Sequence, residues 1–180
     1  KVGVETYYLC IHLLLMECGD PKGKWGRGFL PIKERYIKKM KEKNVSVNTC
    51  HIPLDSHKQL GPNIAIAKAL NAQILKEASL KTKNEYVLFG KIEKTNTSKL
   101  ITLLKEIFDI PYVDFEGKEL DNIEKVAIVA GCGDVVDWIK EAEEKGAQAY
   151  ITGEIHCHID NEYGKQKYKQ MMKYVENTSM

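Results

Sequence analysis

The amino-acid sequence predicts an α/β fold, in which mostly parallel or mixed β-sheets are flanked by helices. Short apolar runs alternate along the chain with segments whose apolar residues recur at helical spacing. Glycines stand at several points where one kind of segment gives way to the other. Such alternation is typical of a sheet covered by helices. At 180 residues the chain is long enough to bury a hydrophobic core in one or two compact lobes.

The first four elements are expected in the order strand, helix, strand, helix. Residues 7–16 are rich in large apolar side chains and lead into a glycine-rich loop, which predicts a buried strand. After Pro31, apolar residues recur at helical spacing among lysines, which predicts a surface helix with one buried face. Residues 45–50 are expected to form the second strand, and residues 63–70 the helix that follows it.

The middle of the chain predicts a strand, a helix and a further extended segment. The alternation over residues 85–93 favours a strand, and residues 97–108 form a clear amphipathic pattern. Thr97 or Ser98 is expected to cap this helix. Residues 110–115 are expected to be extended, and the whole block is compatible with an inserted lobe.

The last part of the chain holds the strongest strand signal. Residues 125–130 are apolar after their first lysine, as in a strand buried on both faces. The turn at 131–133 leads into an amphipathic helix, which Gly146 is expected to end. Residues 149–152 then predict another strand, and residues 165–175 a last helix.

Composition limits the classes of partner and the cellular setting. With 27 basic and 25 acidic residues, the formal charge of +2 provides no long-range field for nucleic acid or for a membrane surface. The five cysteines are odd in number and form no CxxC pair, so a reducing, cytoplasmic setting is expected. The apolar run at 7–16 is too short to span a bilayer and lacks the features of a signal peptide.

A histidine and an aspartate stand four residues apart directly after the second predicted strand. In the run His51-Ile-Pro-Leu-Asp55 these groups lie at the carboxyl edge of the sheet, where α/β proteins place their ligand sites. An imidazole and a hard carboxylate at this spacing can converge on one divalent cation. The spacing leaves a structural alternative open, in which His51 caps the strand, Pro53 shapes the turn and Asp55 hydrogen-bonds the loop.

Glu17 and Cys18 follow the first predicted strand and therefore reach the equivalent edge of the sheet. Neighbouring parallel strands lie about 4.8 Å apart, so these side chains are within reach of the same point and the two clusters form one candidate pocket. The alternative is that Cys18 is a small buried hydrophobe and Glu17 belongs to a solvated loop.

A third cluster, Glu154, His156 and His158, closes the last predicted strand. The two histidines alternate along the chain, so only one of them is expected to face inward. Gly131–Gly133 could cradle an anion with backbone amides, although tight packing explains these glycines equally well. The dinucleotide fingerprint is not completed, because Val136 stands where its third glycine belongs.

Taken in order, five short motifs make the chain similar to the NIF-three-like family, whose members are commonly catalogued as GTP cyclohydrolase type-two homologues. The resemblance covers roughly residues 14–165. The motifs are Glu17-Cys-Gly19, Cys50-His-Ile-Pro-Leu-Asp-Ser-His57 with Leu60-Gly-Pro-Asn63, Phe89-Gly90, Val129-Ala-Gly-Cys-Gly133, and Ile151-Thr-Gly-Glu154.

The resemblance implies a two-lobed α/β architecture, with a first lobe over residues 1–80 that carries the metal motif and a second over residues 81–180 that completes the site. It also implies subunits that assemble as ring-shaped homohexamers, with two divalent metal ions per subunit, which would be zinc, iron, manganese or magnesium. In the family the ligands come from a His-His pair, the aspartate of the His-x-Pro-Leu-Asp block and a later Gly-His…Glu motif.

Carried over residue by residue, the resemblance supplies only part of this ligand set. Asp55 matches the family's aspartate, and His51 matches a histidine that lines the site and occasionally binds metal. The His-His pair falls on Glu17 and Cys18, so either a carboxylate and a thiolate bind metal there or the site is altered. The later Gly-His…Glu motif has no counterpart, and Glu154 matches a residue expected at the pocket wall.

These implications lead to one functional hypothesis and one rival. The hypothesis is a metal-dependent hydrolase, similar to a GTP cyclohydrolase, that acts on a small molecule. Asp55, assisted by Glu17, Cys18 or His51, would hold ions that activate water, and His51 or Glu154 would move the proton. Nothing in the residues selects a purine substrate. The rival is a non-catalytic, metal-binding oligomeric adaptor or regulatory protein.

Overall fold

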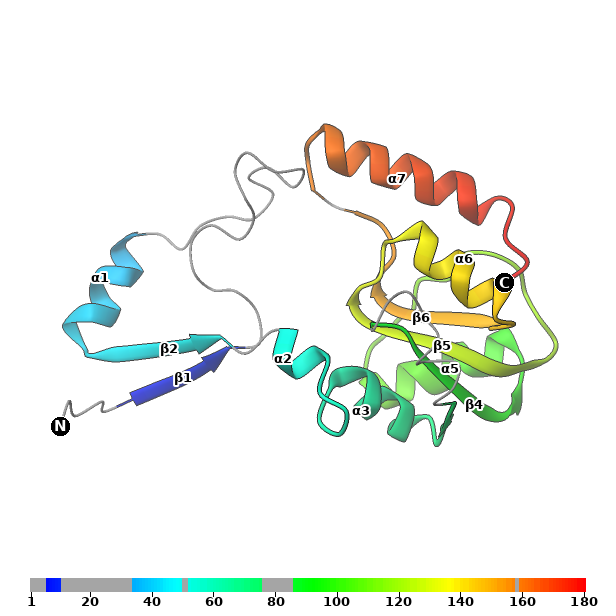
Figure 1. The fold of residues 1–180 in the computed structure, drawn as a ribbon, viewed down its shortest axis with the longest axis horizontal. Coiled ribbons are helices and arrows are strands. Elements are labelled where there is room, and N and C mark those ends of the chain that lie inside the picture. Colours follow the sequence, from blue (N-terminus) through cyan, green and yellow to red (C-terminus); the bar gives the residue numbers. More distant parts are fainter. Residues whose placement is uncertain (1–5, 11–33, 50–51, 76–85, 158) are drawn as a thin grey trace.

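A computed structural model describes residues 6–10, 34–49, 52–75, 86–157 and 159–180. Helices and strands alternate along most of the chain, as Figure 1 shows. The elements are β1 (Thr6–Cys10), α1 (Glu34–Glu42), β2 (Val45–Thr49), α2 (Ile52–Asp55), α3 (Pro62–Ala69), β3 (Gln73–Ile74), β4 (Leu88–Thr95), α5 (Thr97–Phe108), β5 (Ile123–Cys132), α6 (Val136–Glu144), β6 (Ala149–Glu154) and α7 (Glu162–Val175).

The strands form two sheets. In the smaller one, β1 and β2 are parallel and in register, with Cys10 opposite Thr49. The larger one has the order β3-β4-β5-β6, in which β4 is antiparallel to β3 and β5, whereas β5 and β6 are parallel. The predicted α/β class with mostly parallel or mixed sheets is confirmed, and the larger sheet is the mixed kind.

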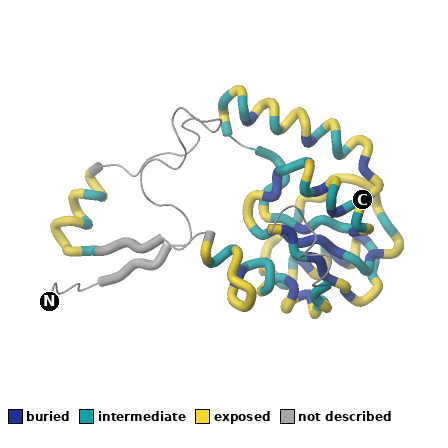
Figure 2. Tube along the Cα trace, in the orientation of Figure 1, coloured by how far each residue is buried: buried dark blue, intermediate teal, exposed yellow. Residues whose placement is uncertain are grey.

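The larger sheet is buried on both faces, and β5 explains why. Successive side chains of a strand point to opposite faces, so Val126 and Ile128 join one hydrophobic cluster, while Ala127 and Val129 join another. All four are nearly inaccessible to solvent. In Figure 2 the dark blue, buried segments gather in the part of the molecule that holds the larger sheet, surrounded by yellow and teal segments. The unbroken apolar run in the sequence therefore reflects a strand that is covered on both sides.

Helices from three parts of the chain cover these two faces. Leu70, directly after α3, packs in the same cluster as Leu100 and Leu104 of α5, and Ala142 of α6 packs on the other face. α3 thus shares a core with elements that follow the predicted lobe boundary at residue 80. That boundary falls among residues outside the described ranges and stays a prediction.

The expected helix ends are only partly right. The N-cap of α5 is Asn96, whose side chain accepts a hydrogen bond from Lys99 N at 2.9 Å, so the expectation of Thr97 or Ser98 is wrong. Gly146 has a φ of 78°, and the following amide donates to Ala142 O at 2.9 Å. This is the hydrogen-bond pattern in which a left-handed glycine ends a helix, as the sequence predicts for α6.

The segment after α5 forms no strand. Residues 110–115 join neither sheet, and the extended form predicted for them stays a prediction. They belong to a longer strap, defined here as residues 110–118, that crosses the molecule between α5 and β6. Lys118 N donates to Met180 O at 2.7 Å, and Leu120 N donates to Thr97 Oγ1 at 2.8 Å just beyond the strap. These bonds tie its far end to the C-terminal residue and to the start of α5.

Candidate functional site

Asp55 ends α2, the short helix that follows β2. Its side chain is half-buried and takes part in interactions within the protein. Because β1 and β2 are parallel and in register, both strands end at the same edge, and α2 continues from that edge. Of the four metal ligands predicted from the sequence, Asp55 is described, whereas Glu17, Cys18 and His51 lie outside the described residues.

The turn between α2 and α3 is built around Gly61 and His57. A Cβ atom on Gly61 would lie 2.7 Å from His57 O and 2.9 Å from Asp55 O, so only glycine allows the chain to close here. His57 Nδ1 accepts the amides of Gln59 and Leu60 at 3.2 and 3.1 Å. His57 therefore shapes this turn, and its Nδ1 lone pair is used within the protein.

Asn63, in the first turn of α3, joins the turn region to the larger sheet. Its Nδ2 donates to Tyr86 O at 2.8 Å, and its Oδ1 accepts from Ala130 N at 2.6 Å. The two contacts bridge 23 and 67 positions of sequence. The Leu60-Gly-Pro-Asn63 motif thus fixes the segment that carries Asp55 beside the carboxyl end of β5.

The carboxyl ends of β5 and β6 pack unusually closely. A Cβ atom on Gly133 would lie 2.9 Å from Thr152 Cβ, and one on Gly153 would lie 3.1 Å from Gly131 O. Gly133 N donates to Glu154 O at 3.0 Å, so this amide is not available to cradle an anion. Close strand packing accounts for Gly133 and Gly153, and the left-handed φ of 77° accounts for Gly131.

Asp134 occupies a buried position just beyond β5. It is 3% exposed, and its Oδ1 lies 2.6 Å from Lys167 Nζ and accepts from Cys132 Sγ at 3.0 Å. Its Oδ2 is buried and has no hydrogen-bond partner in the structure of the described residues. The ion pair joins α7 to the end of β5.

Asp134 contributes to raising the pKa values of two neighbouring side chains. Burial raises the pKa of the Cys132 thiol to about 12, and the hydrogen bond to Asp134 adds to this. Burial alone would lower the pKa of Lys167, but its bond to Asp134 raises it. Cys132 is therefore a protonated and weakly nucleophilic thiol at neutral pH.

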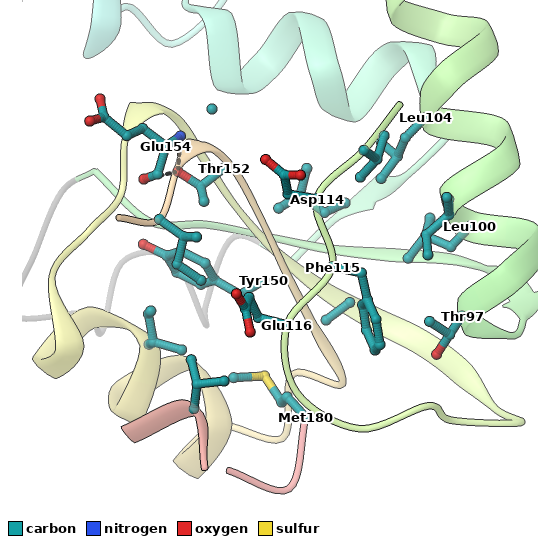
Figure 3. Close-up of a pocket in the computed structure, with 18 of the residues that line it drawn as sticks. Thr97, Leu100, Leu104, Asp114, Phe115, Glu116, Tyr150, Thr152, Glu154 and Met180 are labelled. Carbon is teal, nitrogen blue, oxygen red and sulfur yellow. Dashed lines mark hydrogen bonds between the residues drawn. The ribbon is translucent and has the colours of Figure 1, made fainter. Parts of the chain in front are cut away.

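A cleft of about 840 Å³ lies between the strap, α5 and β6. Figure 3 shows Leu100 and Leu104 on its α5 side, Tyr150 and Thr152 on its β6 side, and the strap between them. Its volume falls within the usual range of small-molecule sites. The sequence does not predict this cleft, because an irregular strap carries no periodic signal.

Glu154 and His156 lie at the β6 end of this cleft. Glu154 is half-buried and lines the cleft, and its predicted place at the wall of the metal pocket stays a prediction. His156 Nε2 lies 3.0 Å from Glu116 Oε1 of the strap, and its ring is 5.1 Å from that of Tyr168. His158 lies outside the described residues. The catalytic roles predicted for His51 and Glu154 stay predictions.

The described residues alone do not assemble a metal centre. Among them, no group of three or more histidine, cysteine, aspartate or glutamate side chains is placed to hold an ion. In the same part of the chain, no helix is both long enough and apolar enough to cross a bilayer.

The fold and these motifs define an α/β protein whose polar side chains gather at the carboxyl edges of its parallel strands. Residues 30–173 match the sequence profile of the Duf34/NIF3 family (NGG1p interacting factor 3), and the chain belongs to this family. The resemblance seen in the sequence is thereby confirmed.

Relatives of known name support the same assignment. The GTP cyclohydrolase 1 type 2 homolog of Pyrococcus abyssi is 32% identical over 140 residues, which are 76% of this chain and 54% of that protein. The protein of the same name from Buchnera aphidicola subsp. Acyrthosiphon pisum is 32% identical over 138 residues, 74% of this chain and 53% of that protein. This chain thus spans about half the length of the curated relatives it matches.

Solved structures share the fold at low sequence identity. Protein ybgI, a structural-genomics target of unknown function, superposes with a TM-score of 0.66 and 19% identity, covering 92% of this chain and 60% of that one. Reduced HcgD from Methanocaldococcus jannaschii gives a TM-score of 0.57 and 19% identity, covering 92% and 59%. Likeness at this identity establishes the architecture alone.

Proposed function

We propose that the protein binds divalent metal ions and acts as a metal-dependent hydrolase on a small molecule. The observation that carries this proposal is the parallel, in-register pairing of β1 with β2, which brings both carboxyl ends to one edge. Asp55 ends α2, the next element along the chain after β2. Ligand sites of α/β proteins lie at such edges. The curated names of the relatives, which include the words GTP cyclohydrolase, point to the same class of reaction.

In this proposal Asp55 is one metal ligand, and Glu17, Cys18 and His51 complete the set. Carboxylate, thiolate and imidazole together suit zinc or iron better than magnesium, which prefers oxygen ligands alone. A bound divalent ion would lower the pKa of a water molecule and polarise an electrophilic carbon or phosphorus. His51 or Glu154 would accept and return the proton. Two ions per subunit and a homohexamer, which the family resemblance implies, complete the proposal together with the cytoplasmic setting that the cysteine pattern favours.

The rival function is a non-catalytic, metal-binding oligomeric adaptor. It is favoured by the replacement of the family's His-His pair with Glu17 and Cys18, because such a change alters the ligand set. Both functions place metal at Asp55, and they differ in whether the protein turns over a substrate. One experiment that measures metal content and turnover together therefore separates them.

The test compares Asp55→Ala with Asp137→Ala, a change of an exposed aspartate in the first turn of α6. Metal content is measured by elemental mass spectrometry, and hydrolysis is measured on GTP and on a panel of nucleotides and phosphate esters. We expect Asp55→Ala to lose bound metal and turnover together, while Asp137→Ala keeps both. Stoichiometric metal without turnover in the unchanged protein would favour the adaptor. Equal metal in the unchanged protein and in Asp55→Ala would refute the proposed site.

A further inference from the structure

The cleft beneath the strap has an apolar body. Leu100 and Leu104 of α5 form one wall, Ile151 of β6 forms part of the other, and Phe115 of the strap adds an aromatic ring. Within the described part of the sheet, β6 has a strand neighbour only on its β5 side. Its apolar walls and its volume of about 840 Å³ make the cleft large enough for a drug-sized molecule.

Acidic groups dominate the charges of this cleft. Asp114 and Glu116 of the strap and Glu154 at the end of β6 line it, against Lys118 as its one lysine or arginine among the described residues. In Figure 3 the carboxylates of Asp114 and Glu116 lie between the α5 wall and the β6 wall. Asp114 and Glu116 are both exposed at the edge of the cleft, so each would attract a cation bound beside it modestly, and the two would act together.

We propose that this cleft binds an amphipathic cation, a molecule with an apolar chain or ring and an ammonium or guanidinium head. The apolar part would lie along Leu100, Leu104 and Phe115. The cationic head would donate hydrogen bonds to the carboxylates of Asp114 and Glu116. Charge-assisted hydrogen bonds to a carboxylate are among the strongest polar contacts. One carboxylate oxygen of Glu116 would keep its bond to His156.

The same charges disfavour an anionic ligand. A nucleoside triphosphate would bring several negative charges against Asp114, Glu116 and Glu154, which costs free energy in a partly desolvated site. The cleft thus suits a different class of ligand from the phosphate-bearing molecules of the proposed hydrolysis, and the two proposals share only Glu154. It does not depend on the metal proposed at Asp55.

The test uses three probes of equal chain length, namely octylammonium, octanoate and 1-octanol. Binding is measured by titration calorimetry and by amide chemical-shift changes in nuclear magnetic resonance spectra. We expect octylammonium to bind at least tenfold more tightly than octanoate, with the largest shifts at Leu104 and Ile151. 1-Octanol should fall between them, because it keeps the apolar contacts but carries no charge.

Isosteric variants locate the head group. Asp114→Asn and Glu116→Gln should each weaken octylammonium binding about two- to fivefold, the effect of removing one exposed charged contact. The control Asp121→Asn, an exposed change outside the cleft, should leave it unchanged. Asp55→Ala should also leave it unchanged, which separates this inference from the proposed metal site. Equal binding of octylammonium and octanoate, or full affinity in Asp114→Asn, would overturn the proposal.

Discussion

The two hydrogen bonds of Asn63 give the most direct test of how the Asp55 segment is held. Asn63→Ala removes the acceptor of Ala130 N and the donor to Tyr86 O, which lie 2.6 and 2.8 Å from the amide. Each lost bond of this kind costs about 1 kcal/mol net, and somewhat more where a partner stays buried. We therefore expect a loss of about 2 kcal/mol in the free energy of unfolding.

Urea denaturation followed by circular dichroism measures this loss. A change of about 2 kcal/mol corresponds to a fall in Tm of roughly 4–8 °C for a chain of this size. The control is Asn177→Ala, which removes one exposed bond from Nδ2 to Lys173 O at 2.8 Å. It should cost no more than about 0.5 kcal/mol, as surface changes usually do.

Asn63→Asp separates the two contacts. The aspartate keeps an oxygen for Ala130 N but places a second oxygen against Tyr86 O, so it should cost at least as much as the alanine variant above pH 6. If Asn63→Ala destabilised the protein no more than Asn177→Ala, the idea that Asn63 anchors this segment would be wrong.

Three further predictions concern other contacts. Gly61→Ala should lower the free energy of unfolding by about 2 kcal/mol or more in urea titrations, because its Cβ would meet His57 O at 2.7 Å; a change below 0.5 kcal/mol would contradict this. Lys167→Met should cost about 3 kcal/mol, because it leaves the Asp134 carboxylate buried without its cation, and adding Asp134→Asn should restore most of the loss. Burial alone would raise the pKa of Glu143, but hydrogen bonds from Ser179, Tyr174 and Thr178 lower it to about 2. The stability from this group is present above its ordinary pKa of 4.5 and is lost as the pH falls toward 2. Glu143→Gln should therefore flatten the dependence of Tm on pH over that range, and an unchanged profile would refute the assignment.

Local patterns predict most elements of the fold well. The amphipathic pattern over residues 97–108 gives the bounds of α5, and the apolar run at 125–130 marks the centre of β5. The cap of α5 is harder to predict, because Asn96, Thr97 and Ser98 are all good capping residues and only the backbone geometry selects among them. β3 is two residues long, too short to leave a periodic signal.

Local sequence patterns do not predict contacts between residues that are far apart in the sequence. Lys167 pairs with Asp134 across 33 positions, and no spacing rule links a lysine in the middle of α7 to an aspartate after β5. The same holds for Asn63 and Ala130. Asp55 and Glu154 could be singled out because they follow predicted strands. The cleft could not, since it depends on where an irregular strap crosses the sheet.

Because β5 is buried on both faces of the larger sheet, we expect little motion in the part of the sheet beside the cleft. Its amides can exchange with solvent only when both hydrophobic clusters separate, which amounts to unfolding of the larger sheet. Gly133 and Glu154 share a hydrogen bond at the end of this rigid unit, so the inner wall of the cleft should be among the slowest regions in hydrogen-exchange measurements. Any opening that admits a ligand must then come from the strap, whose far end is held by the carbonyl of Met180.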